Sequence, residues 1–205
     1  MALVDNDVME KLALLDLFEE FESLEVCADG ALLLTTARFR YRSGGAPKKL
    51  KKKYGEAARD RVVAVSQAGE PLPETTVLLP ALVGIGDVDP GEAELFSAAM
   101  ILEGQHVLTG DKRCIQALAL AAAENVAVAA IVGALAGRVM CLEQVMWALV
   151  KRHGADVIRA RVKAVPGVDM SVTAIFASAD LESECRYRIE EVRLMAAGLL
   201  HPLQP

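Results

Sequence analysis

The sequence is poor in aromatic residues, in histidine and in paired cysteines. Phe, Trp and Tyr make up only 4% of a chain that is 53% hydrophobic, so we expect a core built from Leu, Val, Ala and Ile. The three histidines are scattered, and the four cysteines contain no Cys-x-x-Cys pair. The chain therefore offers neither the spacing of a zinc site nor a disulfide framework, and a reducing cytoplasmic compartment fits it best.

Long hydrophobic runs are also missing. The longest apolar stretch, residues 126–137, is too short to span a bilayer and contains Gly133, so we expect it to be buried core. The opening Met-Ala-Leu-Val-Asp lacks the basic and apolar regions of a signal peptide. We therefore expect a cytoplasmic protein with no membrane partner.

The net charge of −6 is unevenly distributed along the chain. Between Arg38 and Arg61, ten Lys and Arg stand against two acids, a local charge of +8, which leaves −14 (−6 minus +8) for the remainder. An acidic body argues against a protein that simply coats nucleic acid, but one basic segment can still bind a polyanion locally. The candidate nucleic-acid contacts in this segment are Arg38, Arg40, Arg42, Lys48, Lys49, Lys51, Lys52 and Lys53.

Aromatic residues lie among these bases. Phe39, Tyr41 or Tyr54 would be available to stack on the bases of RNA or single-stranded DNA while the cations contact phosphates. A solvated helix face above buried aromatics explains the same pattern without any ligand. The sequence leaves both interpretations open.

Short apolar runs alternate with stretches of helical periodicity. We expect strands at 2–4, 31–34, 105–109 and 138–141. We expect helices at 8–24, 48–65, 92–102, 112–123 and 142–152. This alternation is typical of an α/β fold, with a mostly parallel central sheet in a three-layer α/β/α arrangement.

The chain length favours one domain with an extension. We expect an α/β domain at 1–150 and a C-terminal helical extension at 151–205 that packs on the same domain. The extension carries an apolar stripe at helical spacing, formed by Leu181, Cys185, Ile189, Val192 and Met195. This stripe either packs back on the domain or forms the surface of a homodimer.

Three acidic segments follow expected strands or begin expected helices. They are Asp5-Asn-Asp7, Asp89-Pro-Gly-Glu92 and Gly110-Asp111. Loops after parallel strands converge on one edge of a sheet, so we expect these carboxylates to lie together. Two unpaired carboxylates about 4 Å apart repel by roughly 4 kcal/mol at an effective dielectric near 20. A converged cluster therefore needs a cation or a proton, and oxygen ligands favour Mg²⁺ or Mn²⁺.

Each acid also has a purely structural explanation. Asp7-Val-Met-Glu10 and Asp89-Pro-Gly-Glu92 fit capping boxes, and Asp111 fits a helix N-cap. Each cap would stabilise its helix by about 1 kcal/mol. For any one acid alone the cap is the simpler interpretation, and only the convergence of all three favours a metal site.

The acidic motifs resemble, in order and spacing over roughly residues 1–150, those of the PIN-domain nucleases. The resemblance rests on Leu3-Val-Asp5-Asn-Asp7-Val8, Asp89-Pro-Gly-Glu92-Ala-Glu94-Leu95 and Leu108-Thr-Gly-Asp111-Lys-Arg113. It implies a parallel α/β/α sandwich and a metal-dependent nuclease, often acting on RNA, often a homodimer and in some members paired with an antitoxin. It makes Asp5, Glu92 and Asp111 the expected catalytic residues. The same three and Asp7 are the expected ligands of Mg²⁺ or Mn²⁺.

One segment departs from the family pattern. The family usually has a further Glu in the helix after its second strand, whereas residues 34–42 offer bases and no acid. We therefore keep a second hypothesis, a PIN-like fold that serves as a binding or assembly module without catalysis. A third hypothesis is a phosphatase of the haloacid-dehalogenase type, because Asp5-Asn-Asp7 also resembles that family's Asp-x-Asp opening. That hypothesis leaves Asp89-Pro-Gly-Glu92 without a role.

Overall fold

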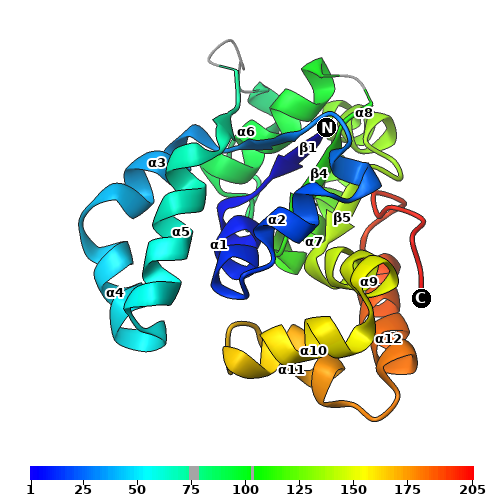
Figure 1. Cartoon of the computed structure of the whole chain (residues 1–205). Coiled ribbons are helices and arrows are strands. Elements are labelled where there is room, and N and C mark those ends of the chain that lie inside the picture. Colours follow the sequence, from blue (N-terminus) through cyan, green and yellow to red (C-terminus); the bar gives the residue numbers. More distant parts are fainter. Residues whose placement is uncertain (74–78, 103) are drawn as a thin grey trace.

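The computed structural model, which describes residues 1–73, 79–102 and 104–205, shows a parallel sheet between layers of helices (Figure 1). In these residues the strands are β1 (Ala2–Val4), β2 (Ala31–Leu33), β3 (Glu70–Pro71), β4 (His106–Thr109) and β5 (Val139–Cys141). Their order is β3-β2-β1-β4-β5, and every neighbouring pair is parallel. The expected three-layer α/β/α fold class is confirmed.

The central strand β1 is buried along its whole length. Leu3 pairs with Leu32 of β2 on one side and with Val107 of β4 on the other. A strand covered on both faces needs an unbroken apolar run, which is why the sequence predicts it. The strand β3 was not predicted, because Glu70–Pro71 carries no apolar pattern and lies at the sheet edge, where proline is tolerated.

Helices cover both faces of the sheet (Figure 1). One face carries α1 (Asn6–Leu14), α2 (Phe18–Glu22), α3 (Thr35–Arg42), α4 (Gly45–Tyr54), α5 (Glu56–Ala68) and α9 (Leu142–His153). The opposite face carries α6 (Pro90–Ile101), α7 (Lys112–Glu124) and α8 (Val126–Ala134). Short 3₁₀ turns, η1 (Glu25–Cys27) and η2 (Pro80–Leu82), lie in the connections.

Two of the expected helices are each divided in two. The stretch 8–24 breaks near Asp16, whose φ is 58°, and the stretch 48–65 breaks at Gly55, whose φ is 88°. Residues in the left-handed region cannot continue a right-handed helix. Apolar periodicity did not reveal these breaks, because the helices on both sides of each break bury residues in the same core.

The apolar run at 126–137 forms α8, and the expectation that it is buried core is correct for one face only. Val128, Ile131 and Val132 are buried, whereas the side chain of Val126 is 87% exposed. Among the residues that the structure describes, no helix combines the length and the hydropathy of a membrane-spanning segment.

The C-terminal helices pack on the α/β layers. They are α10 (Ala155–Ala164), α11 (Met170–Ala177) and α12 (Leu181–Met195), and α12 contacts α7, α9 and α11. The predicted stripe of α12 is buried within the chain, apart from the half-buried Met195. The segment that follows α12 runs beside β5. The backbone N–H of Val139 donates to the carbonyl oxygen of Leu199, and the N–H of His201 donates to the carbonyl oxygen of Val139, so this segment extends the sheet. The stripe therefore packs back on this chain.

The winding of the chain reverses between β1 and β4. After β1 the chain enters α1 on one face and proceeds to β2, whereas after β4 it enters α7 on the other face and proceeds to β5. Ligands of open parallel sheets bind at the carboxyl ends of the strands at such a switch point. The fold thus places the residues that follow β1 and β4, among them Asp5 and Asp111, at the expected position of a site.

Candidate functional site

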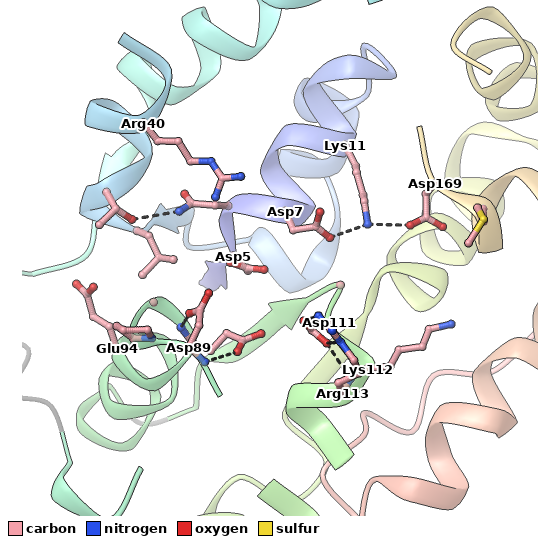
Figure 2. Close-up of a pocket in the computed structure, with 18 residues that line it drawn as sticks. Asp5, Asp7, Lys11, Arg40, Asp89, Glu94, Asp111, Lys112, Arg113 and Asp169 are labelled. Atoms are coloured by element: carbon pink, nitrogen blue, oxygen red, sulfur yellow. Dashed lines mark hydrogen bonds and ion pairs between the residues drawn. The ribbon is translucent and has the colours of Figure 1, made fainter. Parts of the chain in front are cut away.

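A cleft of about 840 Å³ lies at this edge of the sheet (Figure 2). Among the described residues, the acids that line it are Asp5, Asp7, Asp89, Glu92, Glu94, Asp111 and Asp169. The cations that line it are Lys11, Arg40, Lys112 and Arg113. All four predicted metal ligands therefore share one cleft with a set of basic side chains.

Asp5 is a buried acid at the end of β1. Its side chain is 8% exposed, and its backbone N–H donates to the carbonyl oxygen of Leu108 across the strand end. Burial, followed by the nearby carboxylates of Asp7 and Asp89, raises the pKa of Asp5 to about 6. Among the described residues, no Lys or Arg forms an ion pair with it. The backbone N–H groups of Asn6 and Asp7 offset only part of this rise in pKa, so Asp5 is a carboxylate without a positively charged partner among these residues.

Glu92 lies in the first turn of α6 and is 4% exposed. Its Oε2 accepts from the backbone N–H of Asp89 at 2.9 Å, and Asp89 Oδ1 accepts from the N–H of Glu92 at 2.8 Å. The predicted capping box is confirmed. Burial, with smaller contributions from the carboxylates of Asp89 and Asp111, raises the pKa of Glu92 to about 7. The cap satisfies hydrogen bonds but supplies no positive side chain.

Asp111 caps α7, as its position in the sequence predicted. Its Oδ1 accepts from the backbone N–H groups of Arg113 at 2.8 Å and Cys114 at 3.3 Å. Its Oδ2 pairs with Arg113 Nη2 at 2.9 Å. Burial opposes ionisation, but the Arg113 guanidinium and the backbone hydrogen bonds outweigh it and lower the pKa of Asp111. This carboxylate is charged and already has a cation, although the highly exposed Arg113 makes the pair a weak one.

Asp7 lies within α1, so its predicted role as an N-cap is wrong, and the N-cap position belongs to Asp5. Asp7 Oδ2 pairs with Lys11 Nζ at 2.6 Å. A Cβ atom at Gly110 would lie 2.3 Å from Asp7 Oδ2, so this carboxylate rests directly against the turn that leads to Asp111. Glycine at 110 is therefore needed for the close approach of Asp7 to the β4–α7 turn.

Several residues of the cleft were not predicted as site residues. Lys11 bridges Asp7 and Asp169, and burial, which would lower its pKa, is outweighed by these two carboxylates, so the pKa of Lys11 is raised. No sequence pattern indicates the contact of Lys11 with Asp169, because the two residues are 158 positions apart. On α3, Thr36 accepts from Asn6 Nδ2 at 3.1 Å and Arg40 lines the cleft. Thus a hydroxyl and a guanidinium lie where the resemblance led us to expect an acid.

Arg40 differs from the other seven predicted nucleic-acid contacts. Among the described residues, it is the one member of that set that lines the cleft. Arg38 donates to the carbonyl oxygen of Gly69 at 2.8 Å and ties α3 to the end of α5. On α4, Lys51 pairs with Glu56 at 2.8 Å. The exposed members of the set are Arg40, Arg42, Lys48, Lys49, Lys51, Lys52 and Lys53. The basic segment therefore forms a solvated face beside the cleft, with Arg38 serving a structural role.

The aromatic residues of the basic segment are placed differently from one another. Phe39 is 70% exposed and available for stacking. Tyr41 is fully buried and its hydroxyl donates to Glu10 Oε2 at 2.5 Å, so the expectation that it stacks on bases is wrong. Tyr54 is half-buried and donates to the carbonyl oxygen of Gly167 at 3.2 Å.

The donor chemistry of the cleft fits a hard divalent cation, although the carboxylates are not assembled around one. Among the described residues, no three His, Cys, Asp or Glu side chains are grouped closely enough to hold a metal ion. Asp7 and Asp111 are turned to Lys11 and Arg113 instead. Oxygen donors are the ligands that Mg²⁺ and Mn²⁺ prefer. A shared ion would therefore require Lys11 and Arg113 to release their carboxylates.

Comparisons of the chain with protein-family models, curated proteins and solved structures found no match. Membership of the PIN-domain family therefore stays a prediction from the quoted motifs. The structure contributes the fold class and the cleft that these motifs share.

Proposed function

We propose that this protein is a nuclease that depends on Mg²⁺ or Mn²⁺ and cleaves RNA or single-stranded DNA in the cleft. Asp5, Glu92 and Asp111 are the catalytic carboxylates, and Asp7 joins them as a metal ligand. A bound divalent ion would polarise a phosphoryl group and lower the pKa of a bound water. The chain itself supplies Arg40, beside the cleft's acids, to hold the substrate's phosphates.

The observation that supports this proposal most is the burial of Asp5 and Glu92 in one cleft, where neither forms an ion pair with a Lys or Arg among the described residues. An unpaired buried carboxylate costs several kcal/mol, and proteins rarely keep two of them together without use. Hydrogen bonding by caps explains the placement of Glu92 but leaves its charge uncompensated. A divalent cation would compensate both carboxylates at once.

The decisive experiment is cleavage of a panel of RNA and single-stranded DNA with Mn²⁺ or Mg²⁺. A metal ion supplies several kcal/mol of charge stabilisation and each 1.36 kcal/mol is tenfold in rate, so Asp5→Asn and Asp111→Asn should each lose at least about 100-fold in rate. Glu94→Gln removes a carboxylate that lines the same cleft but is not one of the four proposed metal ligands. This variant should cleave like the wild type. Cutting that persists in Asp5→Asn, or that needs no metal, contradicts the proposal.

A non-catalytic binding module is the second candidate, and two observations favour it. No three acids are grouped as a metal site among the described residues, and α3 offers Thr36 and Arg40 instead of an acid. Binding of RNA by a folded wild type that cleaves nothing with either metal would select this candidate. The phosphatase hypothesis gains no such observation, because the acids Asp89 and Glu92 remain without a role in it.

We expect the exposed lysines of α4 to contribute to the salt dependence of nucleic-acid binding under either candidate. The double variant Lys48→Gln/Lys49→Gln removes two cations and should flatten the slope of log affinity against log salt by about 1.4 for a single strand. Anisotropy titrations of a labelled single-stranded RNA at several salt concentrations measure this slope. The charge-matched variant Lys151→Gln/Lys163→Gln, on α9 and α10, should leave it unchanged. An unchanged slope in the α4 variant rules the segment out.

A further inference from the structure

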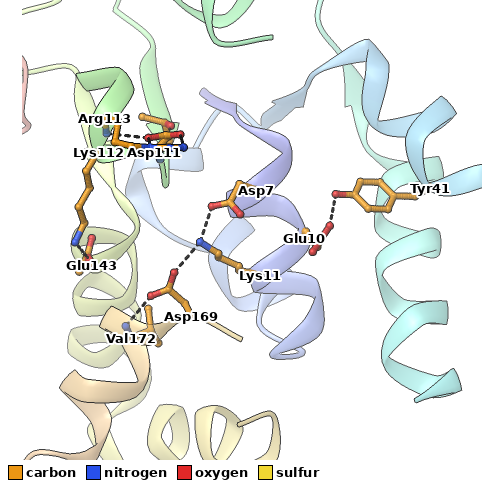
Figure 3. A network of polar contacts seen from close by, with 11 residues as sticks. Asp7, Glu10, Lys11, Tyr41, Asp111, Lys112, Arg113, Glu143, Asp169 and Val172 are labelled. Atoms are coloured by element: carbon orange, nitrogen blue, oxygen red, sulfur yellow. Dashed lines mark hydrogen bonds and ion pairs between the residues drawn. The ribbon is translucent and has the colours of Figure 1, made fainter. Parts of the chain in front are cut away.

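Lys11 connects the four proposed metal ligands, Asp5, Asp7, Glu92 and Asp111 (the carboxylate cluster), to the C-terminal extension (Figure 3). Its Nζ lies 2.6 Å from Asp7 Oδ2 and 2.7 Å from Asp169 Oδ2, and its side chain is only 15% exposed. Asp169 is itself held in place, because its Oδ1 accepts from the backbone N–H of Val172 at the start of α11. One largely buried ammonium group is therefore shared between an acid of the cluster and an acid of the extension.

The ammonium group lies at the edge of the cluster. A Cβ atom built at Gly110 would be 2.3 Å from Asp7 Oδ2 and 3.5 Å from Lys11 Nζ. Both groups thus lie beside the turn between β4 and Asp111, and Lys11 neutralises an oxygen of Asp7 that a metal ion would otherwise bind. While Lys11 is paired with Asp7 Oδ2, a metal ion must compete with the ammonium group for this oxygen.

We propose that Lys11 is a built-in counter-ion that competes with the divalent cation for Asp7, and that Asp169 keeps Lys11 paired when the cation takes Asp7. This inference rests on the proposed binding of a metal by the cluster. An ammonium group in this position is costly to leave without a partner, so release of Asp7 depends on the second acid. The C-terminal extension thereby sets the metal affinity of a site built by residues between positions 5 and 111.

A competing explanation is a general effect of charge. Removing the cation Lys11 would tighten metal binding and removing the anion Asp169 would weaken it, even if the two residues never exchanged partners. The two explanations differ in additivity. If the partners exchange, the effect of Asp169→Asn on metal affinity depends on the presence of Lys11. If only a general effect of charge operates, the effects of the two substitutions on metal affinity are independent and add.

The test is a double-mutant cycle with Mn²⁺ affinity as its readout, measured on the whole chain by the electron paramagnetic resonance signal of free Mn²⁺. Lys11→Met should tighten binding by about tenfold and Asp169→Asn should weaken it by about tenfold, as coupled neighbours do. In the Lys11→Met background, Asp169→Asn should have an effect of less than about twofold. The exposed pair Arg186 and Glu182, substituted as Arg186→Met and Glu182→Gln, should leave Mn²⁺ affinity unchanged.

The outcomes separate this inference from the proposed function. Wild-type binding with purely additive effects of the two substitutions overturns the inference and leaves the metal site standing. Absence of Mn²⁺ binding in both the wild type and Lys11→Met overturns the proposed function, and the inference with it. Lys11→Gln provides a second neutral variant, and circular dichroism of every variant confirms that the fold is retained.

Discussion

Replacing Asp5 by Asn, or Glu92 by Gln, will stabilise the metal-free protein and, under the proposed function, will abolish metal-dependent cleavage. Burial and neighbouring carboxylates raise the pKa of Asp5 from 3.8 to about 6 and that of Glu92 from 4.5 to about 7. One pKa unit corresponds to 1.36 kcal/mol, so each ionised group destabilises the fold by up to about 3 kcal/mol at pH 8. An amide of the same shape removes this charge, and we expect each variant to gain about 1–3 kcal/mol in the free energy of unfolding.

The dependence on pH follows from the direction of these shifts. A raised pKa means that the folded state binds the proton more tightly than the unfolded state does, so stability is highest below the unfolded value. Wild-type stability should therefore fall as the pH rises from about 4 to about 7, and the Asp5 and Glu92 variants should lose part of this slope.

Urea unfolding in EDTA at pH 5 and at pH 8 measures both effects. The exposed Asp156 gives a control, because Asp156→Asn should change the free energy of unfolding by less than about 0.5 kcal/mol. Added Mn²⁺ should stabilise the wild type more than either variant, since an ion that binds only the folded state shifts the equilibrium toward it. If Asp5→Asn lowers stability at pH 8 in EDTA, Asp5 is not an uncompensated charge.

The two explanations of the acids, helix caps and metal ligands, are compatible in this fold. Helices that connect parallel strands run back across the sheet, so their N-termini lie at the same edge as the strands' carboxyl ends. Helix N-termini favour carboxylates through free N–H groups and the helix dipole. Asp89 and Asp111 use this environment as caps, and the same placement brings Glu92 and Asp111 into one cleft with Asp5.

The sequence predicted the parts of the fold that are encoded locally. The buried strands β1, β2, β4 and β5 and the capping box at Asp89 each depend on residues within a few positions of one another. The division of the expected helices depends on single backbone angles, at Asp16 and Gly55, that apolar periodicity does not report. The edge strand β3 depends on pairing with β2, which its own residues do not encode.

The candidate site was predictable to a similar extent. Asp5, Glu92 and Asp111 follow strands or begin helices, and parallel topology alone brings such positions together. The partners of these acids were not predictable, because Lys11 meets Asp169 only when the C-terminal helices pack on the rest of the chain, where they contact α7 and α9. Sequence therefore indicates which acids gather at the cleft, and tertiary packing decides which of them already carry a cation.

Lys112→Met will destabilise the protein by about 3 kcal/mol, because it leaves a buried charge without a partner. Lys112 Nζ pairs with Glu143 Oε1 at 2.5 Å, and the side chain of Glu143 is 2% exposed (Figure 3). The other oxygen, Glu143 Oε2, is buried and has no hydrogen-bond partner among the described residues. Asp111 follows Thr109 of β4 by two residues, and Glu143 follows Cys141 of β5 by two residues. Because Thr109 pairs with Cys141, the two acids lie at the same edge of the sheet.

A double variant identifies the cause of this loss. The double variant Lys112→Met/Glu143→Met should recover most of the stability, since apolar residues of similar volume often replace a buried ion pair without cost. Lys51→Met breaks an exposed pair and should cost less than about 1 kcal/mol. Chemical unfolding of the wild type and the three variants at pH 7 measures these differences. A double variant that stays as unstable as Lys112→Met would show that lost packing, not the unpaired charge of Glu143, is responsible.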